Sequence, residues 1–253
     1  MAKHYNTKKK AKRKIILLRI MQIVFIMVLI ISILKLYKWY KENNENKEIL
    51  MDISSEVIVD DNKQSNDIDR YEINFQSLKE KNNDITAWIK VNNTNIEYPV
   101  VKTTDNSYYL KHSFDKNDNT AGWIFADYRN TFDTTDKNMV IYGHNRKDGS
   151  MFGTLKNVLN AEWYENEENR NIIFITENEK SIYKVFSIYK IENEDYYIQT
   201  DFSNEKYSEF LNTIKNRSIK NFNEEITDED KILTLSTCDN DNKYRVVVHA
   251  KKI

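Results

Sequence analysis

An apolar segment near the N-terminus constrains this chain more than any other feature. Apolar residues run from Ile15 to Leu34, directly after a tail rich in lysine and arginine. About 20 consecutive apolar residues can cross a bilayer as a helix, and positively charged flanks stay on the cytoplasmic side. We therefore expect a basic cytoplasmic tail over residues 1–14 and a transmembrane signal anchor over residues 15–36. The rest of the chain is then extracellular, held at the cell membrane.

Two other interpretations of this segment are weaker. A cleaved signal peptide needs a small-residue cleavage site, but the apolar run is followed by KLYKWYKENNENKE, with an aromatic cluster at Tyr37, Trp39 and Tyr40. A buried helix of a soluble protein is disfavoured because the segment is apolar on all sides and follows a cationic tail. An uncleaved anchor is the favoured reading.

Composition excludes several classes of function. The chain has 38 lysine and arginine residues against 39 aspartate and glutamate residues, a net charge of −1, so nothing points to a nucleic-acid partner. There is no glycine-rich phosphate loop and no cluster of metal ligands, so we expect no cofactor and no metal. The single cysteine cannot form an intramolecular disulfide, so an extracellular fold must rest on its core.

Polar composition separates a linker from a folded domain. Residues 37–69 are rich in Asn, Asp, Glu and Lys, which predicts an extracellular linker, and a domain follows over residues 70–253. A helix is expected around YEINFQSLKEKN, and helical spacing recurs at Met151–Leu159 and Tyr207–Ile214. The strand candidates are NIEYPVV, AGWIFAD, NMVIYG, NIIFIT, SIYKVFSIYKI, KILTLST and YRVVVHAK. Many short strands in one domain indicate a β-barrel or a sandwich.

The only cysteine, Cys238, ends one of these strand candidates. Period-two alternation in KILTLSTC puts Leu233 and Leu235 on one face and Cys238 on the other. In YRVVVHAK, Arg245 lies on the face opposite to the valines at 246 and 248. If the leucine and valine faces form the core, Cys238 and Arg245 emerge together across the DNDNKY connection, about 5 Å apart at Cβ.

A nucleophilic cysteine needs a nearby histidine or cation, because only a few per cent of an unperturbed thiol is ionised at neutral pH. His144 is preferred because it directly follows the strand NMVIY, in the turn GHN. His4 lies in the tail, His112 has no clear setting, and His249 lies about 13 Å along its strand from Arg245. These residues alone leave an alternative open: a buried thiol, a solvated histidine and a surface arginine.

At these residues the chain resembles the sortases, the membrane-anchored cysteine transpeptidases of Gram-positive bacteria. The resemblance extends from about Phe75 to the C-terminus. It rests on TLSTC with an arginine on the following strand, on YGHN, and on NIEYPVV, DNSYYL, GWIFADYRN and DGSMFGTL. The serine in TLSTC and the long insertion that carries the helix around Phe210 resemble class B in particular.

The resemblance implies a mainly β fold, an eight-stranded sortase-type β-barrel with N-terminal helices and a helix in the insertion before the cysteine-bearing strand. It implies Cys238 as nucleophile, His144 as acid/base and Arg245 as the group that binds substrate and stabilises the oxyanion. The implied substrates are surface proteins with a C-terminal sorting motif of the Asn-Pro-x-Thr-x type. They are cleaved after Thr through a thioacyl intermediate and transferred to a peptidoglycan precursor or another amine acceptor.

Several points stay open at this stage. The spacing from cysteine to arginine is shorter than in some class B members, so the loop between them is expected to differ. Ser236, Thr237, Tyr196 and Tyr197 are candidate substrate-binding residues, each with an ordinary structural role as the alternative. Two other functions compete with cell-wall anchoring: a pilin-polymerising sortase, whose acceptor is a lysine of another subunit, and a non-catalytic membrane-tethered binding module.

Overall fold

The computed structural model describes residues 2–60, 67–133, 135–192, 194–238 and 243–253, with Cys238 described at its main chain. The chain divides into two compact units, Met1–Glu45 and Asn46–Ile253. Helix α1 (Ala2–Ser54) carries the basic tail and the apolar segment. From Arg13 to Ser54 it is long and apolar enough to cross a membrane, and no part of its most apolar window is buried by protein. An apolar surface of this extent is typical of a lipid-covered segment.

The second unit begins earlier than residue 70, the boundary that composition predicts. Ile53, at the end of α1, is fully buried in the core. Beyond it, strand β1 (Val57–Val59) pairs with β2 (Tyr71–Ile73) as a two-stranded antiparallel sheet. Asn46 and Asn119 exchange two hydrogen bonds of 3.1 and 3.4 Å. Part of the expected linker is therefore folded, because Ile53 and Ile68 are buried in the core and Val57 packs against it.

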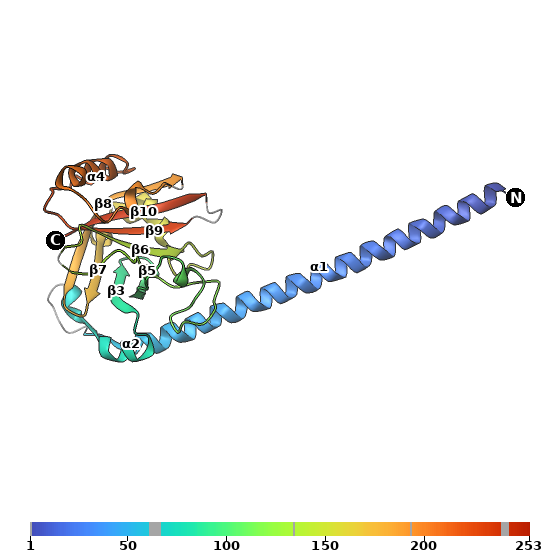
Figure 1. The fold of residues 1–253 in the computed structure, drawn as a ribbon, viewed down its shortest axis with the longest axis horizontal. Coiled ribbons are helices and arrows are strands. Elements are labelled where there is room, and N and C mark those ends of the chain that lie inside the picture. The colour runs from blue at the N-terminus through green and yellow to red at the C-terminus, as the bar shows by residue number, and fades with distance from the viewer. Residues whose placement is uncertain (1, 61–66, 134, 193, 239–242) are drawn as a thin grey trace. The chain divides into compact units, whose positions relative to one another are not determined.

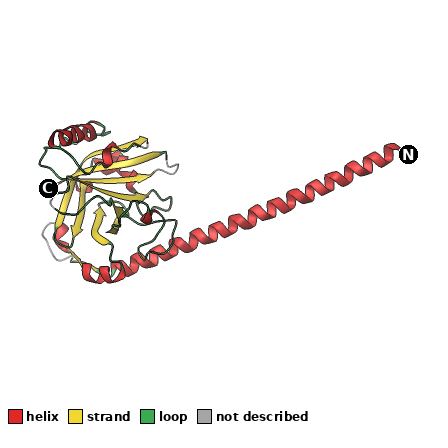
Figure 2. Cartoon of the chain, in the orientation of Figure 1, coloured by secondary structure: helices red, strands yellow, loops and turns green. Residues whose placement is uncertain are grey.

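Eight strands close into a barrel (Figures 1 and 2), which confirms the expected fold class. Their order around the barrel is β10, β8, β7, β3, β4, β5, β6, β9, with β9 beside β10. The pairs β4–β5 and β6–β9 are parallel, and the other pairs are antiparallel. The strands are β3 (Ile85–Val91), β4 (Glu97–Val101), β5 (Phe125–Ala126), β6 (Asn138–His144), β7 (Asn171–Thr176), β8 (Lys180–Glu192), β9 (Ile232–Cys238) and β10 (Tyr244–Lys252).

Period-two alternation builds two separate cores from the same strands. Leu233, Leu235 and Val248 belong to the large core, whereas Ile232 and Val247 belong to a second cluster on the other face of the sheet. This second cluster is covered by α4 (Asn204–Asn216), the helix in the insertion between β8 and β9, which lies beside β8 and β10 in Figure 1. Its buried stripe is the set with the predicted helical spacing: Tyr207, Phe210, Leu211 and Ile214.

Short helices connect the strands. The helix predicted around YEINFQSLKEKN is α2 (Phe75–Lys81), capped by Asn74, whose side chain accepts a 3.1 Å hydrogen bond from the amide of Ser77. The helical spacing after Met151 corresponds to the 3₁₀ helix η3 (Leu155–Leu159). The others are α3 (Ala161–Tyr164), η1 (Asp67–Arg70), η2 (Tyr108–Leu110), η4 (Glu167–Arg170) and η5 (Tyr196–Ile198).

Candidate active site

His144, Cys238 and Arg245 lie in one row across three adjacent strands. In the parallel pair β6–β9, His144 is the register partner of Cys238. In the antiparallel pair β9–β10, Arg245 is the register partner of the same cysteine. Neighbouring strands are about 4.8 Å apart, so the three main-chain positions span about 10 Å. The fold thus brings together the three residues that the sequence singles out as candidates for catalysis.

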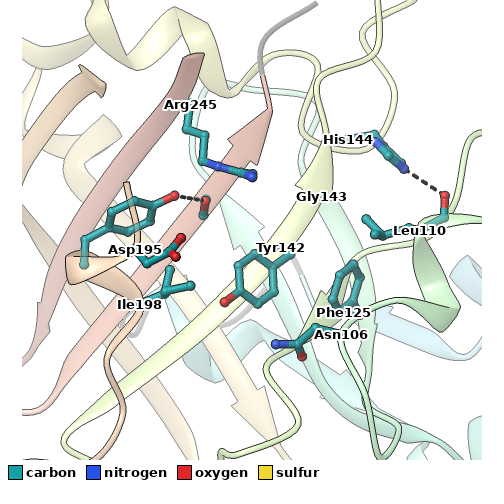
Figure 3. A pocket seen from close by; sticks show the side chains of 11 residues that line it. Asn106, Leu110, Phe125, Tyr142, Gly143, His144, Asp195, Ile198 and Arg245 are labelled. Carbon is teal, nitrogen blue, oxygen red and sulfur yellow. Dashed lines mark hydrogen bonds between the residues drawn. The ribbon is translucent and has the colours of Figure 1, made fainter. Parts of the chain in front are cut away.

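His144 is the last residue of β6 rather than part of a turn. The glycine before it serves close packing and not a sharp bend: a Cβ at Gly143 would lie 2.7 Å from the ring of Phe152. The partly buried imidazole has its Nε2 2.9 Å from the carbonyl oxygen of Leu110 (Figure 3). Because a carbonyl only accepts, Nε2 donates the hydrogen of this contact, which leaves Nδ1 as the other nitrogen of the ring.

A left-handed glycine permits this contact. Gly122 has a φ of +61°, a backbone conformation that residues with a Cβ rarely adopt. A Cβ there would lie 2.5 Å from the carbonyl oxygen of Tyr109 and 2.9 Å from Cδ2 of His144. The next residue, Trp123, donates its amide to the Tyr109 carbonyl at 2.9 Å. The backbone around Gly122 therefore packs directly against η2 and the histidine ring.

A cavity of about 230 Å³ opens beside the row of candidate residues. In Figure 3, Arg245 and His144 lie on opposite sides of it, with the rings of Tyr142 and Phe125 below them in the view. Its walls combine apolar and aromatic groups with a few polar ones, which is typical of ligand sites. It is lined by Asn106, Leu110, Phe125, Tyr142, Gly143, His144, Asp195, Tyr197, Ile198, Ser236 and Arg245.

The four weaker candidates divide into two groups. Ser236 and Tyr197 line the cavity, and their side-chain oxygens lie 3.0 Å apart in a hydrogen bond. Thr237 is buried and does not line it. Tyr196 does not line it either: its hydroxyl donates to Tyr189 at 3.0 Å, and its ring lies under the guanidinium of Arg217. Burial raises the pKa of Tyr196, so its hydroxyl stays protonated at neutral pH.

Sequence reasoning does not single out seven residues of the cavity wall as candidates. They are Asn106, Leu110, Phe125, Tyr142, Gly143, Asp195 and Ile198. Asn106 and Leu110 fall within DNSYYL, and Phe125 falls within GWIFADYRN, so the motifs marked their neighbourhood. The side chains of these motif residues are of types that are found both in cavity walls and in cores. The wall forms only when loops that are distant in the sequence meet over β6 and β9, so the sequence does not show which residues belong to it.

Two other histidines have structural partners. The ring of His112 stacks on Tyr108 with centroids 3.9 Å apart. His249 is fully buried between Thr234 and Tyr189, and each of its ring nitrogens lies 2.8 Å from a hydroxyl. Burial lowers the pKa of His249 to about 3, so the ring is neutral. Among the described side chains, His144 is the one histidine that lines the cavity.

Known proteins with similar sequences and structures belong to one family. The Sortase domain model matches residues 89–253. Sortase B of Listeria monocytogenes is 36% identical over 185 residues, covering 71% of this chain and 74% of that protein, and sortase B of Staphylococcus aureus is 38% identical over 183 residues with the same coverage.

Solved structures extend the match. Sortase B from Bacillus anthracis in complex with AAEK1 is 35% identical, with a TM-score of 0.72 over 85% of this chain and 99% of that one. A Staphylococcus aureus sortase B–substrate complex is 33% identical, with a TM-score of 0.67 over 84% of this chain and 94% of that one. The chain therefore belongs to the sortase family of cysteine transpeptidases, and within it to class B, as its barrel, its row of candidate residues and these matches show.

Proposed function

We propose that this sortase cleaves a C-terminal sorting motif of the Asn-Pro-x-Thr-x type after threonine and transfers the threonine carbonyl to a cell-wall amine. The observation that carries the proposal is the register of His144, Cys238 and Arg245 in one row. A base, a nucleophile and a fixed cation at neighbouring positions are the groups that acyl transfer requires.

In the first half of the reaction, the thiolate of Cys238 attacks the threonine carbonyl carbon and a C–S bond forms. The tetrahedral intermediate collapses when the C–N bond breaks and protonated His144 gives its proton to the departing amine. The Leu110 carbonyl holds the Nε2–H of the ring, so Nδ1 is the nitrogen available for this transfer. The product is a thioacyl enzyme and a released C-terminal peptide.

In the second half, the acceptor amine attacks the thioester. His144, now neutral, takes a proton from the amine as the new amide forms, and the thiolate of Cys238 leaves. Arg245 stabilises the oxyanion in both halves because its guanidinium is permanently charged and planar, and it lines the cavity beside the row.

The cavity supplies the subsite for the motif. Its volume of about 230 Å³ is below the roughly 300–1,000 Å³ of pockets for drug-sized ligands, which suits a short segment of peptide. Ser236 and Tyr197 line it as a hydrogen-bonded pair, while Phe125 and Ile198 offer apolar surface. The acceptor is a peptidoglycan precursor, and the enzyme acts on surface proteins that carry the sorting signal.

The test is cleavage of a library of fluorogenic sorting peptides by the full chain in detergent, with and without amines. We expect one motif to be cut after threonine, a thioacyl adduct on Cys238 in the mass spectrum, and a transpeptidation product when amine is present. Cys238→Ala, His144→Ala and Arg245→Ala should each abolish cutting. A wild type as inert as Cys238→Ala across the library, with no adduct, would refute the proposal.

A further inference from the structure

A buried carboxylate lies behind the cavity wall and collects donors from several elements. Asp127 follows β5 and is fully buried. Its Oδ1 accepts from the amide and Nε of Arg129 at 3.0 and 2.8 Å. Its Oδ2 accepts from Nη2 of Arg129, the hydroxyl of Tyr142 and Nδ2 of Asn106 at 2.7, 2.8 and 2.9 Å. Both oxygens are thus held by several donors at once.

Two of these donors are cavity residues. Asn106 and Tyr142 both line the cavity, so Asp127 fixes one wall from behind. The orientation of Asn106 is set on its other side as well, because its Oδ1 accepts from the amide of Tyr128 at 2.9 Å. The ring of Tyr142 packs at 5.2 Å on Phe125, a third residue of this wall. In Figure 3 these three side chains lie together below the site.

Arg129 connects this wall to the opposite one. Besides the two hydrogen bonds that its side chain donates to the carboxylate, its Nη2 donates to the carbonyl oxygen of Ile198 at 2.8 Å. Ile198 ends η5 in the insertion between β8 and β9, and its side chain lines the cavity on the side where Tyr197 and Asp195 lie. One guanidinium therefore joins the carboxylate behind the first wall to the backbone of the second.

The donors around Asp127 stabilise its ionised form. Burial opposes ionisation, but the hydrogen bonds from Arg129, Tyr142 and Asn106 outweigh it, and the pKa of Asp127 lies below its ordinary value. A buried carboxylate whose oxygens are all engaged by donors holds those donors rigidly, because charge-assisted hydrogen bonds are stronger and more directional than neutral ones.

We propose that Asp127 and Arg129 are positioning residues that set the width of the substrate cavity by tying its two walls together. Neither lines the cavity, so both act through Asn106, Tyr142 and Ile198. The inference rests on the proposed function, since it assigns the cavity to the sorting motif. Lysine cannot replace Arg129, because a single ammonium lacks the planar fork that meets a carboxylate and a carbonyl in fixed directions.

The test compares matched arginine-to-lysine substitutions in the full chain. Arg170 is the control: it also forms a 2.7 Å ion pair, with Glu167, and does not line the cavity. Arg129→Lys should raise KM for the sorting peptide about tenfold and leave kcat within about twofold, the pattern of lost binding rather than lost chemistry. Asp127→Asn should act in the same direction, and Arg170→Lys should keep the wild-type KM.

Two further measurements separate positioning from damage. The rate at which iodoacetamide alkylates Cys238 should match wild type in all variants, and thermal unfolding should show that each variant folds. Wild-type KM in folded Arg129→Lys and Asp127→Asn, or an equal rise of KM in Arg170→Lys, would overturn the inference while the proposed function stands. A wild type that cuts no sorting peptide would instead remove the proposed function, and this inference with it.

Discussion

At the scale of single residues, the role proposed for Arg245 depends on the shape of the cation as much as on its charge. Arg245 is the register partner of Cys238 and lines the cavity. Arg245→Lys keeps the positive charge but loses the planar fork, so we expect kcat for peptide cleavage to fall about 100-fold, the cost of removing one oxyanion donor. Steady-state kinetics with unchanged thermal unfolding would check this. A lysine variant with more than a tenth of wild-type kcat would show that charge alone suffices.

His249 carries a prediction about acid stability. Its folded-state pKa of about 3 is below the ordinary value of 6.5, so the unfolded chain binds the proton more tightly. The stabilisation from the neutral ring is present above pH 6.5 and is lost as the pH falls towards 3. The groups packed on the ring are the hydroxyls of Thr234 and Tyr189 and the rings of Phe186, Tyr197 and Phe210, and none of these gains a proton in that range.

The measurement is the unfolding midpoint of wild type and His249→Gln from pH 7 to pH 4. Glutamine retains a donor and an acceptor but does not titrate in this range, so the variant should be less stable at pH 7 and should lose less stability on acidification. Carboxylates contribute to both curves and cancel in the difference. Parallel curves would show that His249 does not govern the acid response.

At the scale of elements, alternation and helical spacing predicted most of the secondary structure. The strands at Asn171–Thr176 and Ile232–Cys238 and the stripe of α4 appear close to the predicted positions. Strand β3, ITAWIKV, was not among the predicted strands, because buried residues on both faces remove the alternation that marks a strand. Strand pairing is the part that local pattern cannot supply, since β6 and β9 are distant in sequence and parallel.

In the candidate site, too, local pattern predicted some positions, and the contacts between distant segments were not predictable. Period two put Cys238 and Arg245 at facing positions, and the register confirms that pairing. Spacing alone does not select His144 from the four histidines, whereas the β6–β9 register makes it the partner of Cys238. The walls of the cavity were not predictable, because the contact of Arg129 with the Ile198 carbonyl joins a loop after β5 to the insertion after β8.

At the scale of the whole molecule, the single cysteine is also a reporter of topology. From the basic tail expected over residues 1–14 and the anchor expected over residues 15–36, the positive-inside rule predicts that Cys238 lies outside the cell. A membrane-impermeant maleimide should therefore label wild type on intact cells and should not label Cys238→Ala. Lys8→Cys in the Cys238→Ala background is the matched control, and it should be labelled only after permeabilisation. Labelling of Lys8→Cys on intact cells, with wild type protected, would establish the reverse orientation and exclude action on the cell wall.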